Sequence, residues 1–144
     1  MTIEMQHNLE TVCWEKLAEV FEKAPLGTRD PLKLRKVFEN SRYCCFFYDQ
    51  NQIIGSARVL SDGYDCAVIC DVVVLPEYQN QQLGSRMIQY LMQQVADHNK
   101  ILLYAAPGKE GFYQRFSFRR MKTAMAVFKD REKAEKMNLI EKDR

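Results

Sequence analysis

The first part of the chain has apolar residues at helical spacing. In residues 11–24 the apolar positions recur about every third or fourth residue, and Pro25 and Gly27 then interrupt the pattern. The inward positions expected of this first helix are Val12, Leu17, Val20 and Phe21. Trp14 lies in the same segment, and we expect it to join the core rather than to contact a substrate.

A second helix is predicted directly after this break. Asp30 followed by Pro31 is the pairing typical of a helix N-cap and a first helical residue. The aspartate can accept a hydrogen bond from the first turn, and proline has no N–H that would be left unpaired there. The helix should cover residues 31–40. Its inward positions are expected at Leu32, at Leu34 and at either Val37 or Phe38.

The middle of the chain changes to strand patterns. Residues 43–49 and 52–61 are rich in apolar, β-branched and aromatic residues, and the polar residues between them suit a hairpin turn. Residues 67–75 are nearly all apolar, which is typical of a central strand covered on both faces, and Pro76 ends the run. Residues 1–6 are compatible with a short first strand.

Helices and strands alternate in the second half of the chain. From residue 83 to about residue 98 the apolar positions share one face of a helix, and the other face carries Ser, Arg and Gln. The apolar positions are Leu83, Met87, Ile88, Leu91, Met92 and Val95. The elements predicted next are a buried strand over 101–106, a short helix over 107–116, a strand over 118–128 and a polar tail over 129–144 that can form a frayed helix.

This order of elements predicts an α/β (α+β) fold. Strands paired as hairpins, followed by a strand–helix–strand crossover, give a mixed sheet with helices on both sides. Where the antiparallel part meets the parallel part, neighbouring strands can splay, and a ligand can bind beside the helix that begins there. A chain of 144 residues with 47% apolar and 11% aromatic residues is expected to form a single domain over residues 1–144.

Charge and cysteine usage argue against several classes of protein. The formal net charge of +2 is too small to demand a nucleic-acid partner. The first ten residues lack the basic and apolar regions of a signal peptide, and no apolar run reaches the roughly 20 residues that span a bilayer. Five cysteines without an export signal indicate reduced thiols, so we expect a cytoplasmic protein with no membrane partner.

The cysteines do not indicate a metal site, and the basic residues near the end of the chain have two possible roles. Cys66 and Cys70 have a spacing found in some metal sites, but on a strand their Cα atoms would lie about 13 Å apart, so no metal is expected. Residues 115–144 hold ten Lys or Arg against five Asp or Glu. The basic cluster Arg115, Arg119, Arg120 and Lys122 can contact a phosphate of a cofactor or an acidic substrate, or it can be a solvated face.

Residues 72–91 lead from an apolar strand through a polar loop into a helix. The first turn of a helix presents unpaired N–H groups and the positive end of the helix dipole, so its natural ligand is a phosphate or another anion. Phosphate-binding loops usually carry two or three glycines, whereas this loop carries only Gly84.

Two blocks of sequence resemble the GNAT superfamily of acetyl-CoA-dependent N-acyltransferases. The blocks are DVVVLPEYQNQQLGSRMIQYLM, residues 71–92, and ILLYAAPGKEGFYQRFSFRRM, residues 101–121. The matching positions in the first block are Pro76, Tyr78, Gln79 and Gly84, whereas Gln82 and Ser117 stand where the family usually has glycine. The resemblance implies a GNAT-like mixed, mostly antiparallel twisted sheet of about six to seven strands, flanked by helices on both sides.

The resemblance also implies a site for acetyl-CoA as cosubstrate. In the family, the loop N–H groups wrap the pyrophosphate of CoA, and the central strand pairs with the pantetheine arm and aims an N–H at the thioester oxygen. The implied strand residues are Val72, Val73 and Val74, and the implied loop and helix residues are Gln79, Asn80, Gln81, Gln82, Leu83, Gly84 and Ser85. Gln82 can donate its N–H, but its Cβ restricts the loop and can weaken or reshape the phosphate site.

Tyr113 resembles the family's general acid, which protonates the leaving thiolate. A phenol with a pKa of about 10 can protonate a thiolate whose parent thiol has a pKa near 8.5, and it stays protonated at neutral pH. The alternative is that Tyr113 is an amphipathic core residue beside Phe112 and Phe116.

Asp71 is the candidate base that takes a proton from the attacking amine. It is the only charged residue in an otherwise apolar strand, where a carboxylate needs a partner or a wet cleft. The alternative is a structural carboxylate that caps a loop or pairs with an arginine, with water carrying the proton instead.

Together these observations predict an N-acetyltransferase that moves the acetyl group of acetyl-CoA to a primary amine by direct attack. The acceptor is a small-molecule or peptide amine, and in the family the region corresponding to residues 27–36 borders its pocket. An acyl-cysteine route is disfavoured, because no thiol has a histidine in an evident activating motif. The alternatives are a non-catalytic acyl-CoA-binding module and a basic nucleic-acid-binding protein. The protein is expected to be a monomer or a homodimer.

Overall fold

The computed structural model describes residues 3–142 of the chain. The chain forms two compact units, Met1–Leu103 and Tyr104–Arg144. The single domain expected over residues 1–144 therefore stays a prediction.

The first unit contains most of the regular structure. Its strands are β1 (Ile3–Gln6), β2 (Tyr43–Asp49), β3 (Gln52–Ser61), β4 (Cys66–Val74) and β5 (Lys100–Leu102). Its helices are α1 (Trp14–Lys23), α2 (Pro31–Glu39), the 3-10 turn η1 (Pro76–Tyr78) and α3 (Leu83–Gln94). The order predicted from periodicity is confirmed in this unit, although α3 ends before the predicted boundary near His98.

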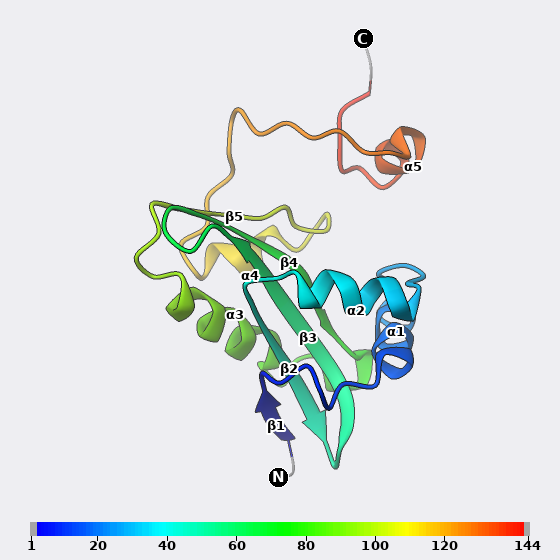
Figure 1. Cartoon of the computed structure of the whole chain (residues 1–144). Coiled ribbons are helices and arrows are strands. Elements are labelled where there is room, and N and C mark those ends of the chain that lie inside the picture. The colour runs from blue at the N-terminus through cyan, green and yellow to red at the C-terminus, as the bar shows by residue number, and fades with distance from the viewer. Residues whose placement is uncertain (1–2, 143–144) are drawn as a thin grey trace. The chain divides into compact units, whose positions relative to one another are not determined.

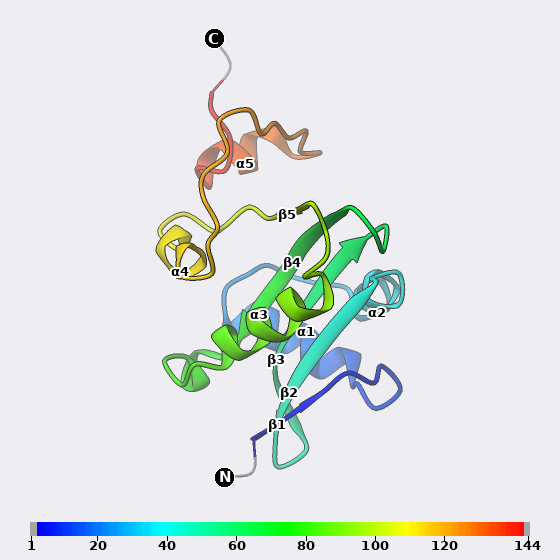
Figure 2. The ribbon, with the colours of Figure 1, turned by 90° about the vertical axis from the view of Figure 1, so that its left-hand side faces the viewer.

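The strands form one mixed sheet in the order β1-β2-β3-β4-β5. The first four are antiparallel to their neighbours, and β5 runs parallel to β4. Helix α3 lies on one face of the sheet, and α1 and α2 lie on the other (Figure 1 and Figure 2). The predicted fold class is confirmed, but the described residues form five strands rather than six to seven.

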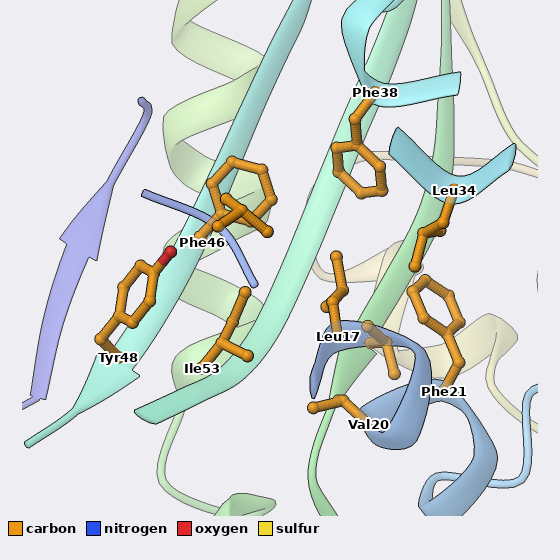
Figure 3. Packing of buried hydrophobic residues seen from close by; sticks show 10 residues of the cluster. Leu17, Val20, Phe21, Leu34, Phe38, Phe46, Tyr48 and Ile53 are labelled. Atoms are coloured by element: carbon orange, nitrogen blue, oxygen red, sulfur yellow. The ribbon is translucent and has the colours of Figure 1, made fainter. Parts of the chain in front are cut away.

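The core of the first unit includes a cluster between the sheet and the α1/α2 layer, shown in Figure 3. Its labelled members are Leu17, Val20, Phe21, Leu34, Phe38, Phe46, Tyr48 and Ile53. Trp14 packs against this cluster, with ring centroids 5.6 Å from Phe38 and 6.3 Å from Phe46, as expected of a core residue.

One predicted core position is wrong. Leu32 is 70% exposed, whereas Leu34 and Phe38 of the same helix are buried. Leu34 and Phe38 are four residues apart and share a face, but Leu32 lies two residues before Leu34 and so points to nearly the opposite side of the helix.

A two-residue turn joins β2 to β3, as the polar linker predicted. Gln50 and Asn51 have φ angles of 49° and 67°, and Asp49 pairs with Gln52 across the turn. Positive φ at both central residues suits the right-handed twist of the flanking strands.

Strands β3 and β4 approach closely at Gly55. A Cβ atom on Gly55 would lie 2.8 Å from the carbonyl oxygen of Val73, which is too close for a backbone atom that cannot move aside. The next residue, Ser56, is fully buried, and its hydroxyl has no hydrogen-bond partner among the described residues. Close packing of β3 on β4 therefore depends on the glycine and not on the serine hydroxyl.

Replacing Gly55 with alanine should lower the free energy of unfolding by about 2 kcal/mol, because the added methyl overpacks the strand pair. Ser56→Ala is the matched control, and it should be neutral or slightly stabilising because it removes an unpaired buried hydroxyl. Urea unfolding followed by circular dichroism measures both changes. Equal stabilities of Gly55→Ala and the unaltered protein would contradict the close approach.

The second unit contains two short helices, α4 (Glu110–Gln114) and α5 (Arg131–Lys136). Both fall in segments where helix was predicted. The strand predicted over 118–128 is wrong, since the described residues of this segment pair with no strand and Met125 and Val127 are 96% and 98% exposed. Apolar patterning favours extended backbone, but a strand also needs a hydrogen-bonded neighbour.

Candidate functional site

The loop before α3 contains two residues in the left-handed backbone region. Asn80 has a φ of 69° and Gln82 a φ of 63°. Asparagine adopts this conformation fairly often, whereas glutamine does so at a cost because its Cβ crowds the backbone. Gln82 thus has the positive φ for which glycine is favoured. The Gln82 side chain does not prevent that backbone conformation.

The loop ends at the start of α3, a helix of 12 residues. Gln82 is its N-cap and makes no side-chain capping hydrogen bond, and the first turn carries no acidic residue. The first-turn residues are Leu83, Gly84 and Ser85, of which Leu83 is buried against the core. The first turn of α3 therefore has no carboxylate that would compete with an anion bound at the positive end of the helix dipole.

Strand β4 extends well past its neighbour β5. The β4–β5 pairing ends at Val68 and Leu102, whereas β4 continues to Val74. Val72, Val73 and Val74 consequently have no strand partner on the β5 side within the described residues. Their backbone groups on that side are available to an extended ligand that adds to the sheet in the manner of a strand.

Two side chains fix the segment between β4 and α3. The Gln79 amide donates a hydrogen bond of 3.0 Å to the carbonyl oxygen of Val74, and the Tyr78 hydroxyl donates to Asp49 at the end of β2. The predicted cofactor residues of β4, the loop and the start of α3 thus lie consecutively in one anchored segment of the first unit. Gln81 completes that segment and is exposed.

Asp71 lies at an irregularity in β4. The β3–β4 register shifts between Ser56 and Arg58, which leaves Asp71 and Val72 opposite Ala57, and Asp71 has a φ of 54°. This is the arrangement of a β-bulge, which bends a strand and redirects a side chain.

Both carboxylate oxygens of Asp71 are paired with arginines. Arg58 Nε donates to Oδ2 at 2.7 Å, and Arg29 Nη1 donates to Oδ1 at 3.2 Å. The side chains of Asp71 and Arg58 are 16% and 14% exposed. The geometry corresponds to the arginine-paired alternative for Asp71. The pairing with Arg29 could not be predicted from a local motif, because the two residues are 42 positions apart in the sequence.

Tyr113 is held in the second unit by the end of α4. The Phe118 N–H donates to the Tyr113 carbonyl and the Ser117 N–H to the Gln114 carbonyl, and Ser117 has a φ of 74°. These bonds form a Schellman motif, in which Ser117 occupies the position that glycine favours. The Tyr113 and Phe118 rings supply the accompanying contact, with centroids 6.1 Å apart. Burial raises the pKa of the Tyr113 phenol.

Three cysteines of the sheet are poor nucleophiles. Burial raises the pKa of Cys44 to about 11 and that of Cys45 to about 12, and it also raises the pKa of Cys70. These three thiols are therefore protonated at neutral pH, whereas the thiolate is the reactive form.

Among residues 3–142, no three His, Cys, Asp or Glu side chains are grouped so that they could hold a metal ion. In the same residues, no helix has both the length and the apolar character needed to cross a bilayer.

Replacing Gln82 with glycine should raise the free energy of unfolding by about 0.5–1 kcal/mol, because glycine adopts positive φ without a Cβ clash while the unfolded chain becomes more flexible. Gln81→Gly is the matched control, since Gln81 is not among the residues with positive φ, and it should be neutral or destabilising. Thermal and urea unfolding measure both. A destabilised Gln82→Gly variant would contradict the left-handed conformation.

Known proteins similar to this chain are acetyltransferases by family or by name. The sequence profile of the Acetyltransferase (GNAT) family matches residues 5–118. The "Uncharacterized N-acetyltransferase ycf52" of Gracilaria tenuistipitata var. liui is 36% identical over 97 residues, covering 62% of this chain and 53% of the relative. The "Serotonin N-acetyltransferase 2, chloroplastic" of Oryza sativa subsp. japonica is 32% identical over 108 residues, covering 71% of this chain and 54% of the relative.

The chain spans about half the length of the curated relatives it matches. Among solved structures, "Acetyltransferase, GNAT family protein SP0256" from Streptococcus pneumoniae TIGR4 is similar with a TM-score of 0.76 and 19% identity. The similarity covers 90% of this chain and 98% of that one, and at this identity it concerns the fold.

Proposed function

Because this chain belongs to the GNAT family of acetyltransferases, we propose that it transfers the acetyl group of acetyl-CoA to a primary amine by direct attack. The observation that carries the proposal is the segment running from the unpaired end of β4 to the uncapped start of α3. Such a segment offers backbone groups to an extended pantetheine arm and, next along the chain, a helix start to a diphosphate.

The chain's own residues would bind acetyl-CoA mainly through their backbone. The N–H groups of the loop from Gln79 to Gln82 and of the first turn of α3 would donate to the diphosphate oxygens. The backbone of Val72, Val73 and Val74 would pair with the pantetheine arm and direct one N–H toward the thioester oxygen. Negative charge develops on that oxygen as the amine attacks, so a donor fixed in advance lowers the barrier.

Tyr113 is the proposed general acid. Its phenol would give a proton to the sulfur of CoA, which would leave with the electron pair of the broken carbon–sulfur bond. The raised pKa of Tyr113 keeps the phenol protonated at neutral pH, as this role requires. A route through an acyl-cysteine is not proposed for Cys44, Cys45 or Cys70, since burial keeps these three thiols protonated.

The proton of the attacking amine is proposed to leave through water. Asp71 was the candidate base, but both of its oxygens already accept hydrogen bonds from guanidinium groups. The acceptor is proposed to be a small-molecule or peptide amine, and the protein to be a cytoplasmic monomer or homodimer without nucleic-acid or membrane partners.

The test combines binding and turnover. Acetyl-CoA should raise the melting temperature, and addition of a suitable primary amine should release free thiol in proportion to acetylated amine. Binding without thiol release from any amine would instead identify a non-catalytic acyl-CoA-binding module. A lack of both stabilisation and calorimetric heat with acetyl-CoA would overturn the proposed cofactor site.

A further inference from the structure

Three charged side chains from distant parts of the first unit meet at the bulge of β4. Asp71 belongs to β4, Arg58 to β3 and Arg29 to the loop between α1 and α2. The Arg29 guanidinium also lies 4.2 Å from the centroid of the Phe21 ring and donates to the Leu26 carbonyl. The cluster therefore fixes the α1–α2 loop against the strand.

The cluster carries more positive than negative charge. Two guanidinium groups and one carboxylate leave a formal charge of +1, and the neighbouring Cys70 thiol stays neutral because burial raises its pKa. Ser41, the other partner of Arg58, is uncharged. A partly buried group of this kind favours an anion as the compensating partner.

The arginines also retain hydrogen-bonding capacity. Arg58 uses Nε for Asp71 and Nη1 for Ser41, and Arg29 uses Nη1 for Asp71 and Nη2 for Leu26. Among the described residues, Arg58 Nη2 and Arg29 Nε make no hydrogen bond. A guanidinium has five N–H donors in a planar fork that matches carboxylate and phosphate oxygens. Arg29 is 31% exposed at its side chain and so can be reached from solvent.

The cluster lies close to the proposed reaction centre. Asp71 directly precedes Val72, and at about 3.3 Å per residue it is roughly 3–10 Å along the strand from the backbone of residues 72–74. If the thioester is bound at the backbone of residues 72–74, the amine that attacks it lies within a few bond lengths of the cluster. A substituent of a small acceptor can therefore reach the arginines.

We propose that Arg29 and Arg58, held in position by Asp71, bind an anionic group of the acceptor, so that the preferred substrates are primary amines bearing a carboxylate or a phosphate. This inference rests on the proposed acetyltransferase function and adds the substrate class to it. Asp71 is then a positioning residue, which aligns the two guanidinium groups rather than removing a proton from the amine.

The alternative to recognition is a purely structural tie, and the two have different kinetic consequences. A structural tie, when broken, lowers the melting temperature and affects turnover of all amines alike. Loss of an anion-binding arginine raises KM for anionic amines and leaves amines without the anionic group nearly unchanged.

The experiment measures thiol release with three matched pairs of amines. The first pair is tyramine and tyrosine, the second is cadaverine and lysine, and the third is ethanolamine and O-phosphoethanolamine. The members of each pair differ mainly in one carboxylate or phosphate. We compare the unaltered protein with Arg29→Gln and with Lys16→Gln. Lys16 is the control, because it is an exposed basic residue of α1 whose ion pair with Glu19 lies on the surface. Melting temperatures are recorded for all three proteins.

The expected result is a higher kcat/KM for the anionic member of at least one pair. Arg29→Gln should raise KM for that member by about tenfold to a hundredfold, the range of a lost charge-assisted hydrogen bond, while Lys16→Gln changes nothing. The carboxylate and phosphate pairs show which anion is preferred. Thiol release without preference for the anionic amines, or a preference that Arg29→Gln leaves intact, would overturn the inference alone. An absence of thiol release from all six amines while acetyl-CoA still binds would count against the proposed function and with it the inference.

Discussion

Tyr113→Phe should lower kcat by about 10²-fold, because the leaving thiolate would lose its positioned proton donor. The KM for acetyl-CoA should stay nearly constant, since the proposed binding contacts are made by the backbone of the first unit. Phenylalanine retains the ring that lies 4.9 Å from Phe112 and 6.1 Å from Phe118, so the Schellman motif at Ser117 should persist. Steady-state thiol release at saturating amine measures the effect.

The pH dependence of this step follows from the direction of the pKa shift. Burial disfavours the charged phenolate, so the pKa of Tyr113 lies above its ordinary value of 10. The acid form is therefore fully present below pH 10 and is lost only as the pH rises through the raised pKa. We expect no loss of kcat that is due to Tyr113 between pH 7 and 9. A falling kcat in that range that disappears in Tyr113→Phe would contradict the shift.

Tyr104→Phe is the matched control for the hydroxyl group. Tyr104 belongs to the same unit and is 71% exposed, and its ring has an edge-to-face contact with Phe128. Removal of its hydroxyl should leave both kcat and stability unchanged. Equal turnover of Tyr113→Phe and Tyr104→Phe would assign Tyr113 to the alternative role of an amphipathic packing residue.

Asp71→Asn should lower the free energy of unfolding by about 2 kcal/mol, because Arg58 and Arg29 lose their shared counter-charge. This expected loss is smaller than that for a fully buried ion pair, because the Arg29 side chain is 31% exposed. Glu39→Gln is the control, since its ion pair with Arg35 is exposed and should be worth at most about 0.5 kcal/mol. Urea unfolding at neutral pH measures both.

The same variant tests the proton route. If water carries the proton of the amine, the acidic limb of the pH–rate profile persists in Asp71→Asn, with a lower rate throughout because the arginines are less well held. A profile whose acidic limb disappears would restore Asp71 as the general base and would refute its assignment as a positioning residue.

The local features of the fold could be predicted from the sequence. Helical and alternating apolar spacing predicted the elements up to β5 in the right order, and the Asp30–Pro31 pair predicted the start of α2. In the structure, Asp30 accepts a hydrogen bond from the Lys33 N–H, as an N-cap should. These features involve residues within a few positions of one another, so the pattern along the chain contains the information.

Conformations that a residue adopts against its preference could not be predicted. Gln82 and Asp71 have positive φ, although neither is a glycine. The sequence predicts that the Cβ of Gln82 restricts the loop. In the structure, the packing of Leu83 into the core and the hydrogen bond from Gln79 to Val74 hold the loop around Gln82. Tertiary contacts can offset a local cost of about 1–2 kcal/mol, and only the folded structure reveals where they do so.

The sequence by itself determined the order of elements up to β5, the α/β class and the strand, loop and helix segment from Val72 to Ser85 that we propose as the acetyl-CoA site. Only the tertiary structure decided that Asp71 is paired with Arg29 and Arg58, and that residues 118–128 have no strand partner within the described residues. The physical reason is the range of the interactions. Periodicity and capping are set by near neighbours, whereas ion pairs and strand pairing depend on which distant segments the fold brings together.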